Sequence, residues 1–171
     1  MTEQRYTVFD TEWGFCGLAW TDKGLCALVL PERKQGLVKG RLQEFWPHAS
    51  PGDQQEVAEY VELIRAYFRG EPVELTARLD LSWATPFQYR IYKTMTGIPA
   101  GETWSYGHLA AIAGAGSARA VGTANARNRI PLFVPCHRVV KANGELGGFS
   151  ASGGTGMKQK LLDLERQSLM P

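Results

Sequence analysis

Three side chains able to support nucleophilic chemistry follow one another at Cys136, His137 and Arg138. A thiol is a weak nucleophile at its ordinary pKa of about 8.5, and a neighbouring base or positive charge increases the fraction present as thiolate. The sequence therefore places a nucleophile beside a base and a fixed positive charge. Because adjacent residues of an extended chain point to opposite faces, His137 reaches the sulfur only if the backbone turns or a water bridges the two.

A purely structural role is the alternative for this pair, because free cysteine is among the most buried residue types. The preceding run Leu132-Phe133-Val134 is apolar and predicts a buried strand. Pro135 ends that strand and favours a turn before the cysteine, since proline cannot continue a sheet ladder and fixes its own φ. These residues alone leave both interpretations open.

The elements that must position the cysteine differ between the two halves of the chain. The first half alternates short apolar segments with turn signals, which is typical of a β-meander. We expect strands at 6–9, 14–20 and 25–30, an amphipathic helix at 55–68 and a further strand within 73–83. Cys16 and Cys26 fall in apolar strands and are expected in the core. With His48 as the only other candidate ligand, this half shows no complete zinc set and no metal is expected.

The second half changes to helical patterns with clear boundaries. Helices are predicted at 85–95, 105–114, 117–126 and 157–167. Thr85-Pro86 marks the first of them, because threonine can cap a helix and proline suits the first helical position. The tight turn Gly114-Ala115-Gly116 between two short helices matches a helix-turn-helix, and the segment 132–156 gives it a winged form. The fold class is therefore α/β, of the α+β type, with domains at 1–83 and 84–171.

Composition describes an ordinary globular protein, with 44% hydrophobic and 21% charged residues. No apolar run approaches the roughly eighteen residues of a membrane span, and the first residues lack the apolar core of a signal peptide. Three widely spaced cysteines argue against a disulfide framework and favour a reducing cytoplasm. Residues 1–83 carry 9 Lys+Arg and 13 Asp+Glu, whereas residues 84–171 carry 10 and 4. A basic second half fits a polyanion partner, although a solvated surface can carry the same charge.

The run Pro135-Cys136-His137-Arg138-Val139-Val140 resembles the active-site signature of the O6-alkylguanine-DNA alkyltransferases, also called methylated-DNA–protein-cysteine methyltransferases. The resemblance is close over residues 85–165 and is only one of size and general pattern before that. It implies DNA repair by irreversible, single-turnover transfer of an alkyl group from O6-alkylguanine in duplex DNA to Cys136. Activity on O4-alkylthymine stays open. No cofactor is implied, since the protein's own side chain accepts the alkyl group.

The same resemblance implies five catalytic positions. Cys136 is the nucleophile, His137 the base acting through a bound water, and Glu165 the carboxylate that orients the histidine. Tyr106 is implied to hydrogen-bond the purine ring as negative charge develops. Asn128 is implied to tie the recognition helix to the active-site loop, as turn asparagines can bridge backbone groups.

The substrate pocket is implied to include Pro131, Val139, Phe149 and Ser150. Val139 offers its backbone carbonyl, and Ser150 its backbone N–H to O6. The sequence departs from the family pattern at Phe149, where many relatives carry tyrosine, and in a slightly longer loop at 150–156. Both departures leave the accepted alkyl size open.

The predicted helix 117–126 carries unusually small side chains, so it can approach another surface closely. Ordinary major-groove readers place long polar side chains there, whereas this helix offers mainly Arg119. By resemblance it docks in the minor groove, and Arg119 fills the space of a base turned out of the stack. The implied DNA-binding residues are Arg119, Ala120, Gly122 and Thr123. Arg127, Arg129 and Lys141 are either phosphate contacts or surface charge, and the sequence does not choose.

Two other function classes fit parts of the pattern. A DNA-binding sensor on the same scaffold would lack the cysteine, which is present here. A Cys-His hydrolase or acyltransferase would not need a basic half or a small-residue helix. We therefore expect an alkyltransferase that binds duplex DNA as a monomer, with cooperative binding along DNA left open.

Overall fold

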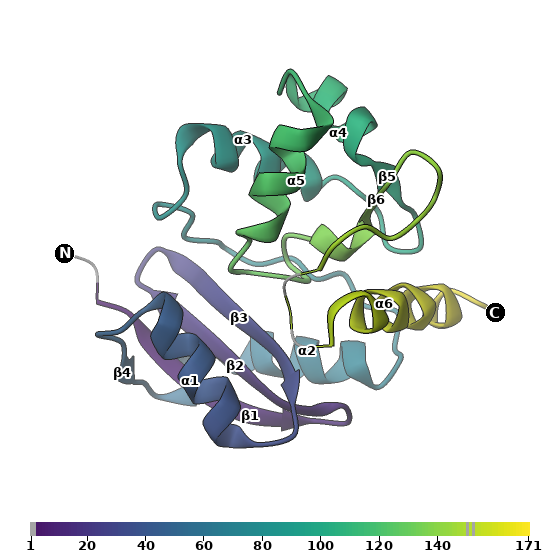
Figure 1. The fold of residues 1–171 in the computed structure, drawn as a ribbon. Coiled ribbons are helices and arrows are strands. Elements are labelled where there is room, and N and C mark those ends of the chain that lie inside the picture. The colour runs from purple at the N-terminus through teal and green to yellow at the C-terminus, as the bar shows by residue number, and fades with distance from the viewer. Residues whose placement is uncertain (1–2, 150, 152) are drawn as a thin grey trace. The chain divides into compact units, whose positions relative to one another are not determined.

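The computed structural model of the chain describes residues 3–149, 151 and 153–171. It divides into two compact units, Met1–Asp80 and Leu81–Pro171. The first unit combines a β-sheet with helices, whereas helices dominate the second unit (Figure 1). The protein is thus of the mixed α+β class, as the sequence predicts. Among the described residues, no helix combines the length and the apolar character needed to cross a bilayer.

The first unit is built on the predicted meander. Strands β1 (Arg5–Thr11), β2 (Gly14–Thr21) and β3 (Gly24–Glu32) are antiparallel. The short β4 (Ser50–Pro51) joins β1 in parallel, which gives the order β3-β2-β1-β4. Gly24, at φ 143°, begins β3 where a Cβ would lie 2.4 Å from the carbonyl oxygen of Arg78, so only glycine fits. Cys16 and Cys26 are both buried in this sheet, which confirms their predicted core role.

Helix α1 (Gln35–Phe45), which the sequence patterns did not reveal, packs on β2 and β3. It buries only Val38 and Leu42, and the approach is close because Gly17 of β2 has no Cβ to clash with them. Two glycines, Gly36 and Gly40, weaken its intrinsic helical preference. The sparse apolar stripe explains why periodicity gave no signal for this helix.

The helix predicted at 55–68 is present as the 3₁₀ turn η1 (Gln54–Val57) followed by α2 (Ala58–Phe68). The strand expected within 73–83 is wrong. That segment makes a single isolated bridge, between Leu79 and Leu25. The segment hydrogen-bonds to the edge of β3 at Leu25, whose N–H donates to the carbonyl of Arg78 and whose carbonyl accepts from the N–H of Asp80.

The second unit contains the helices that the sequence predicts. Helices α3 (Pro86–Met95), α4 (Tyr106–Ala113) and α5 (Ala118–Ala126) each begin after a capping side chain. The caps are Thr85, Ser105 and Ser117, and each accepts a hydrogen bond from the backbone N–H of the third residue of its helix. Gly114 ends α4 in the left-handed conformation, which allows the tight turn into α5.

The rest of the second unit holds a short sheet and the last helix. Strands β5 (Trp104–Ser105) and β6 (Val139–Val140) pair in parallel. Helix α6 (Gly154–Ser168) begins three residues before the predicted Met157 and contacts the cysteine turn. Its buried residues are Lys158, Leu161, Leu162 and Glu165.

The strand predicted at Leu132-Phe133-Val134 is wrong, although all three residues are buried. Leu132 takes a positive φ of 72°, which a strand does not allow. The N–H of Val134 donates to the carbonyl of Ile130 at 2.9 Å, so the chain closes on itself as a turn. The apolar run therefore reflects burial within a turn, which composition alone cannot distinguish from a buried strand.

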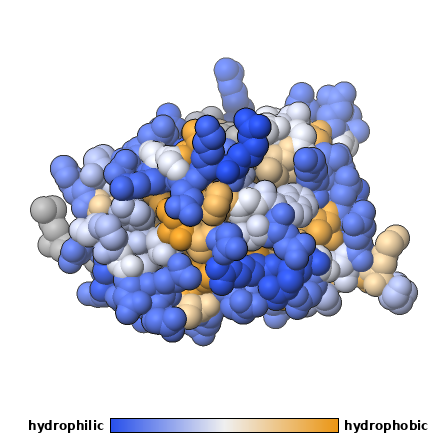
Figure 2. Space-filling model, turned by 90° about the horizontal axis from the view of Figure 1, so that it is seen from below, coloured by the Kyte–Doolittle hydropathy of each residue, from blue (hydrophilic) through white to orange (hydrophobic). Residues whose placement is uncertain are grey.

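Exposed large apolar side chains are scattered over several elements. On the face shown in Figure 2, hydrophilic side chains surround the apolar ones. Within the part of the chain that the structure describes, the exposed large apolar residues are Leu37, Tyr89, Ile112, Leu169 and Met170. Singly exposed apolar residues are normal on protein surfaces, so they carry no argument for a docking face.

Candidate active site

Cys136 begins a short 3₁₀ turn, η2 (Cys136–Arg138), and is 4% exposed. Asn128 holds the preceding loop from inside. Its Nδ2 donates to the carbonyl of Val134 at 2.8 Å, and its Oδ1 accepts from the N–H of Ile130 at 2.9 Å. The side chain thus bridges backbone groups between α5 and the cysteine turn.

A buried ion pair lies next to the cysteine. The Nε2 of His137 lies 2.6 Å from Oε2 of Glu165 on α6. Arg138 donates to both carboxylate oxygens, at 2.8 Å from Nε and 3.0 Å from Nη2, and its Nη1 donates to the carbonyl of Ile98. The structure thus brings together the predicted base and carboxylate, and it adds Arg138 as the second partner of Glu165.

Burial and the neighbouring charges determine the protonation states of Glu165 and His137. Burial alone raises the pKa of the Glu165 carboxyl, but the hydrogen bonds and charges of His137 and Arg138 outweigh it, so the pKa lies far below its usual range. Burial lowers the pKa of His137, against the opposing pull of Glu165. A neutral imidazole carries one N–H. Because Nε2 faces a carboxylate, that proton belongs on Nε2, and Nδ1 is left as an acceptor.

The Nδ1 of His137 is buried and has no hydrogen-bond partner within the described part of the chain. Burial also raises the pKa of the Cys136 thiol, while a hydrogen bond from Asn128 and the charge of Lys158 act in the opposite direction. The thiol is therefore mainly protonated at neutral pH in this state. It needs a base to become a nucleophile, and Nδ1 of the adjacent histidine is an acceptor suited to that role.

Lys158 is a site residue that the sequence motifs did not single out. It is fully buried on α6, and its Nζ donates to the carbonyl of Leu146 at 2.6 Å and lies 3.5 Å from the hydroxyl of Tyr106. Burial lowers its pKa to about 8, and the charge of Cys136 opposes that shift. Its position in the sequence could have indicated this burial. Lys158 lies on the same face of α6 as Leu161, Leu162 and Glu165, at the i, i+3, i+4, i+7 spacing of a buried helical stripe.

A cavity of about 360 Å³ opens between α4, α5 and the loop after β6, and Cys136 is not itself among the residues that line it. Its lining residues include Tyr106, Arg119, Gly122, Asn125, Lys141, Gly147, Gly148 and Phe149. Asn125 connects the cavity to the cysteine, because its Nδ2 lies 3.4 Å from the carbonyl oxygen of Cys136. Burial raises the pKa of Tyr106, so its phenol is a hydrogen-bond donor at neutral pH.

Of the residues that are predicted to form the substrate pocket and that the structure describes, only one lines this cavity. Phe149 lines the cavity, whereas Pro131 and Val139 lie in the segments on either side of Cys136 and are not part of this lining. Val139 is buried in β6. Ser150 falls outside the described residues.

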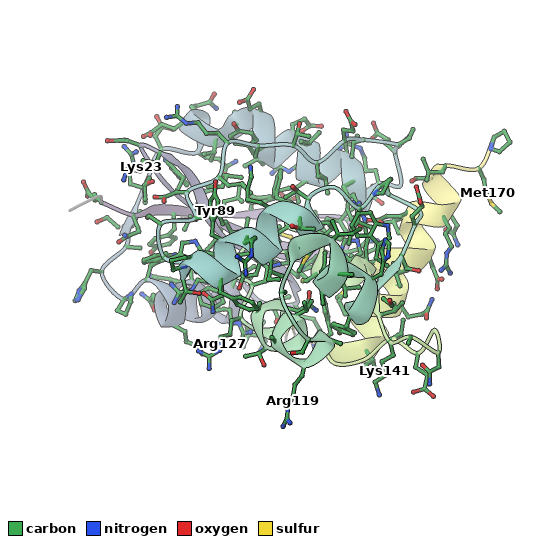
Figure 3. All side chains as sticks on the ribbon, turned by 90° about the horizontal axis from the view of Figure 1, so that it is seen from above. Lys23, Tyr89, Arg119, Arg127, Lys141 and Met170 are labelled. Atoms are coloured by element: carbon green, nitrogen blue, oxygen red, sulfur yellow. The ribbon has the colours of Figure 1, made fainter. Side chains whose placement is uncertain are left out.

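The predicted DNA-binding residues all lie on α5. Arg119 and Thr123 are exposed, while Ala120 and Gly122 are partly exposed. Arg119, Arg127 and Lys141 project from the same side of the second unit (Figure 3). Arg129 behaves differently, because its guanidinium lies over the ring of Trp83, 5.0 Å from the centroid. The structure thus distinguishes Arg129, whose guanidinium packs on an aromatic ring, from Arg127 and Lys141, which project from the second unit.

No group of three or more histidine, cysteine or acidic side chains in the described residues is arranged to hold a metal ion. Cys16, Cys26 and Cys136 form no disulfide bonds with one another. The sulfur of Cys136 is therefore available to act as a nucleophile.

Two family models together match nearly the whole chain. Residues 4–81 match the ribonuclease-like domain of 6-O-methylguanine DNA methyltransferase, and residues 86–167 match its DNA-binding domain. The chain is 45% identical over 165 residues to the constitutive methylated-DNA–protein-cysteine methyltransferase of Bacillus subtilis, and the alignment covers 95% of this chain and 96% of that protein.

Mycobacterial relatives align over a shorter region. The Mycobacterium leprae methylated-DNA–protein-cysteine methyltransferase is 48% identical over 114 residues, which is 66% of this chain and 67% of that protein. The matched region spans 63% of the corresponding Mycobacterium tuberculosis protein. The crystal structure of Mycobacterium tuberculosis OGT in complex with DNA superposes with a TM-score of 0.78 and 38% identity, and the match covers 96% of this chain and 94% of that one.

Proposed function

Because the chain belongs to the 6-O-methylguanine DNA methyltransferase family, we propose that it repairs DNA by moving the alkyl group of O6-alkylguanine irreversibly to Cys136. The observation that carries the proposal is the buried cysteine beside a histidine that Glu165 holds at 2.6 Å, next to a cavity on a DNA-binding unit. Residues 84–171 carry the catalytic and DNA-binding roles, and residues 1–83 form a scaffold. Activity on O4-alkylthymine, which the sequence leaves open, can be measured in the same way with a duplex that carries that base.

The reaction is an in-line displacement at the alkyl carbon. The sulfur of Cys136 forms a bond to that carbon as the bond to guanine O6 breaks, and the electron pair of the broken bond stays on the purine. The thiol proton passes to Nδ1 of His137 through a water, since that nitrogen is a buried acceptor with no partner in the described chain. The Tyr106 phenol on the cavity wall donates a hydrogen bond to the purine as negative charge develops, and the purine takes up a proton from solvent, which balances the proton passed to His137.

Each neighbour has a part in making the sulfur nucleophilic. Glu165 fixes the histidine tautomer with Nδ1 as acceptor and stabilises the imidazolium that forms, as the acid of a catalytic triad does. Arg138 keeps that carboxylate ionised. The positive charge of Lys158 favours the thiolate of Cys136. The thiolate is thus formed during the reaction rather than stored in the free protein.

The target base must leave the duplex before this chemistry is possible, at a cost of a few kcal/mol. The small side chains of α5 let it lie close to the minor groove, and the exposed Arg119 enters the space of the everted base. The cavity beside Cys136 then receives the purine. The segment after β6 acts as the wing of a winged helix-turn-helix, and one chain binds one lesion.

The product is an S-alkyl cysteine, a thioether with no good leaving group, so each chain acts once. No cofactor is needed, because the acceptor is a side chain of the protein. A nucleophile that must stay reduced fits a reducing compartment, so we place the protein in the cytoplasm.

Titration with a duplex that carries one O6-methylguanine tests this function. Intact-mass spectrometry should show one added methyl group per chain, and peptide mapping should place it on Cys136. A Cys136→Ser variant should accept none. A DNA-binding sensor would bind the duplex without gaining mass, and a hydrolase would turn over a small ester without DNA; either result would overturn the proposal.

A further inference from the structure

We propose that Lys141 binds a DNA phosphate that flanks the everted nucleotide, and that Glu145 is its partner in the absence of DNA. The proposal rests on the alkyltransferase function and adds a contact to it. Lys141 lines the cavity together with Arg119, but the two come from different elements. Arg119 lies on α5, and Lys141 follows β6 directly.

The position of the two cations matches the shape of a nucleotide. A base that rotates into the cavity stays attached to its sugar, so the phosphates on both sides remain near the mouth. Arg119 and Lys141 project from the same side of the unit (Figure 3). Arg119 is assigned to the vacated base stack, which leaves Lys141 for the backbone of the everted nucleotide.

The backbone holds Lys141 in a defined place. Its N–H donates to the carbonyl of Glu145 at 2.8 Å, and its carbonyl accepts from the N–H of Gly144 at 2.9 Å. The Oδ1 of Asn143 accepts from the N–H of Glu145 at 3.0 Å. Gly144 has a φ of 86°, which glycine adopts without strain. The lysine thus stands at the start of a closed turn, attached to a paired strand.

The ion pair between Lys141 and Glu145 is weak enough for a phosphate to take the place of the carboxylate. Nζ of Lys141 lies 3.7 Å from Oε2 of Glu145, and the two side chains are 56% and 68% exposed. Exposed pairs at this distance contribute little to stability. A phosphate can therefore replace the carboxylate, while Glu145 lowers the attraction of the mouth for DNA that offers no everted base.

The salt dependence of DNA binding tests the lysine. Dissociation constants for a duplex with one O6-methylguanine are measured over a series of KCl concentrations, in a Cys136→Ala background so that the lesion is not consumed. Lys141→Gln should weaken binding about three- to tenfold and reduce the slope of log Kd against log[KCl] by about 0.9, the value for one lost phosphate contact. The matched control is Lys160→Gln on the exposed face of α6, which should change neither quantity.

Glu145 is tested by a double-mutant cycle with the same duplex. Glu145→Gln should tighten binding about two- to fivefold, in line with an exposed charge pair. If Glu145 acts through the lysine, most of that gain should disappear when Lys141→Gln is also present. An unchanged slope for Lys141→Gln, an equal loss for Lys160→Gln, or a full gain in the double variant would each overturn the proposal.

A second readout separates this proposal from the function on which it rests. In the active protein with Cys136 intact, Lys141→Gln should slow methyl transfer from the duplex at least threefold more than it slows reaction with free O6-benzylguanine. If the parent protein methylates Cys136 but the two slowdowns are equal, the phosphate contact is wrong and the alkyltransferase function stands. If the parent gains no methyl group, the function itself is wrong.

Discussion

At the residue level, the proposed chemistry depends on a carboxylate that stays ionised at neutral pH because its pKa is strongly lowered. Glu165 accepts hydrogen bonds from His137 and Arg138 with almost no exposure to water. A carboxylate in that position holds the imidazole with Nδ1 as the free acceptor. The pattern Cys136-His137 was evident from sequence, but the arginine's part in it was not, because only the fold brings Arg138 to the same carboxylate.

Replacing Glu165 by glutamine tests the relay. The carboxamide keeps the shape but loses the charge that stabilises an imidazolium, so the apparent pKa of Cys136 should rise. Thiol alkylation at pH 7 should slow by roughly tenfold or more, the direction seen when the acid of a triad is neutralised. The rate of alkylation by iodoacetamide between pH 5 and 10 measures this, and the exposed Asp163→Asn on the same helix is the control. An unchanged profile would remove Glu165 from the relay.

A separate prediction concerns Arg119, because its proposed role is to help turn the target base out of the duplex and not to take part in alkyl transfer. Arg119→Ala should slow repair of a lesion in duplex DNA far more than reaction with free O6-benzylguanine, since the free base needs no unstacking. Single-turnover rates on the two substrates provide the comparison. Equal slowing would mean that Arg119 does not occupy the base stack.

At the level of elements, the helix boundaries of the second unit could be predicted because each is encoded locally. Thr85, Ser105 and Ser117 cap their helices in the structure as their positions indicate. The elements that the sequence did not predict correctly depend on contacts between residues far apart in the chain. The run Leu132-Phe133-Val134 is buried in a turn whose hydrogen bonds depend on Asn128, and α1 is stabilised by its packing on the sheet. Neither dependence is visible in a window of neighbouring residues.

Lys158 shows how α6 contributes more than the carboxylate. Its Nζ ties the loop at Leu146 to the helix and lies near the Tyr106 hydroxyl. Lys158→Met removes that tie and the positive charge beside Cys136, so transfer should slow by roughly tenfold or more. Stability should change little, because removing a buried charge offsets the lost hydrogen bonds.

Amide hydrogen exchange can separate these effects for Lys158. In Lys158→Met the amides of residues 146–149 should exchange faster, while those of α3 keep their rates. Lys160→Met, two residues later and exposed, is the matched control. A large loss of global stability, or unchanged exchange in the loop, would contradict the role assigned to this lysine.

At the level of the whole molecule, the buried site makes the stability of the second unit depend on pH. His137 has a lowered pKa in the folded chain, so between that value and the ordinary pKa of about 6.5 the unfolded chain binds the extra proton. Stability is therefore fully present above pH 6.5 and decreases as the pH falls below it. Glu165, whose folded pKa is also lowered, adds a further loss below about pH 4.3.

Below pH 6.5, and down to the lowered pKa of His137, the free energy of unfolding should fall by at most about 1.4 kcal/mol per pH unit, the limit for one proton. It is measured by hydrogen exchange of the α6 amides, which reports the second unit without averaging over the first. His137→Gln should abolish most of the dependence in this window, whereas His48→Gln, an exposed histidine in the first unit, should leave it intact. The direction matters for the mechanism: a histidine that resists protonation when buried is still neutral at pH 7, and only a neutral imidazole can accept the proton of Cys136. If stability instead rose toward pH 5, His137 would be protonated in the folded chain and another base would have to activate the sulfur.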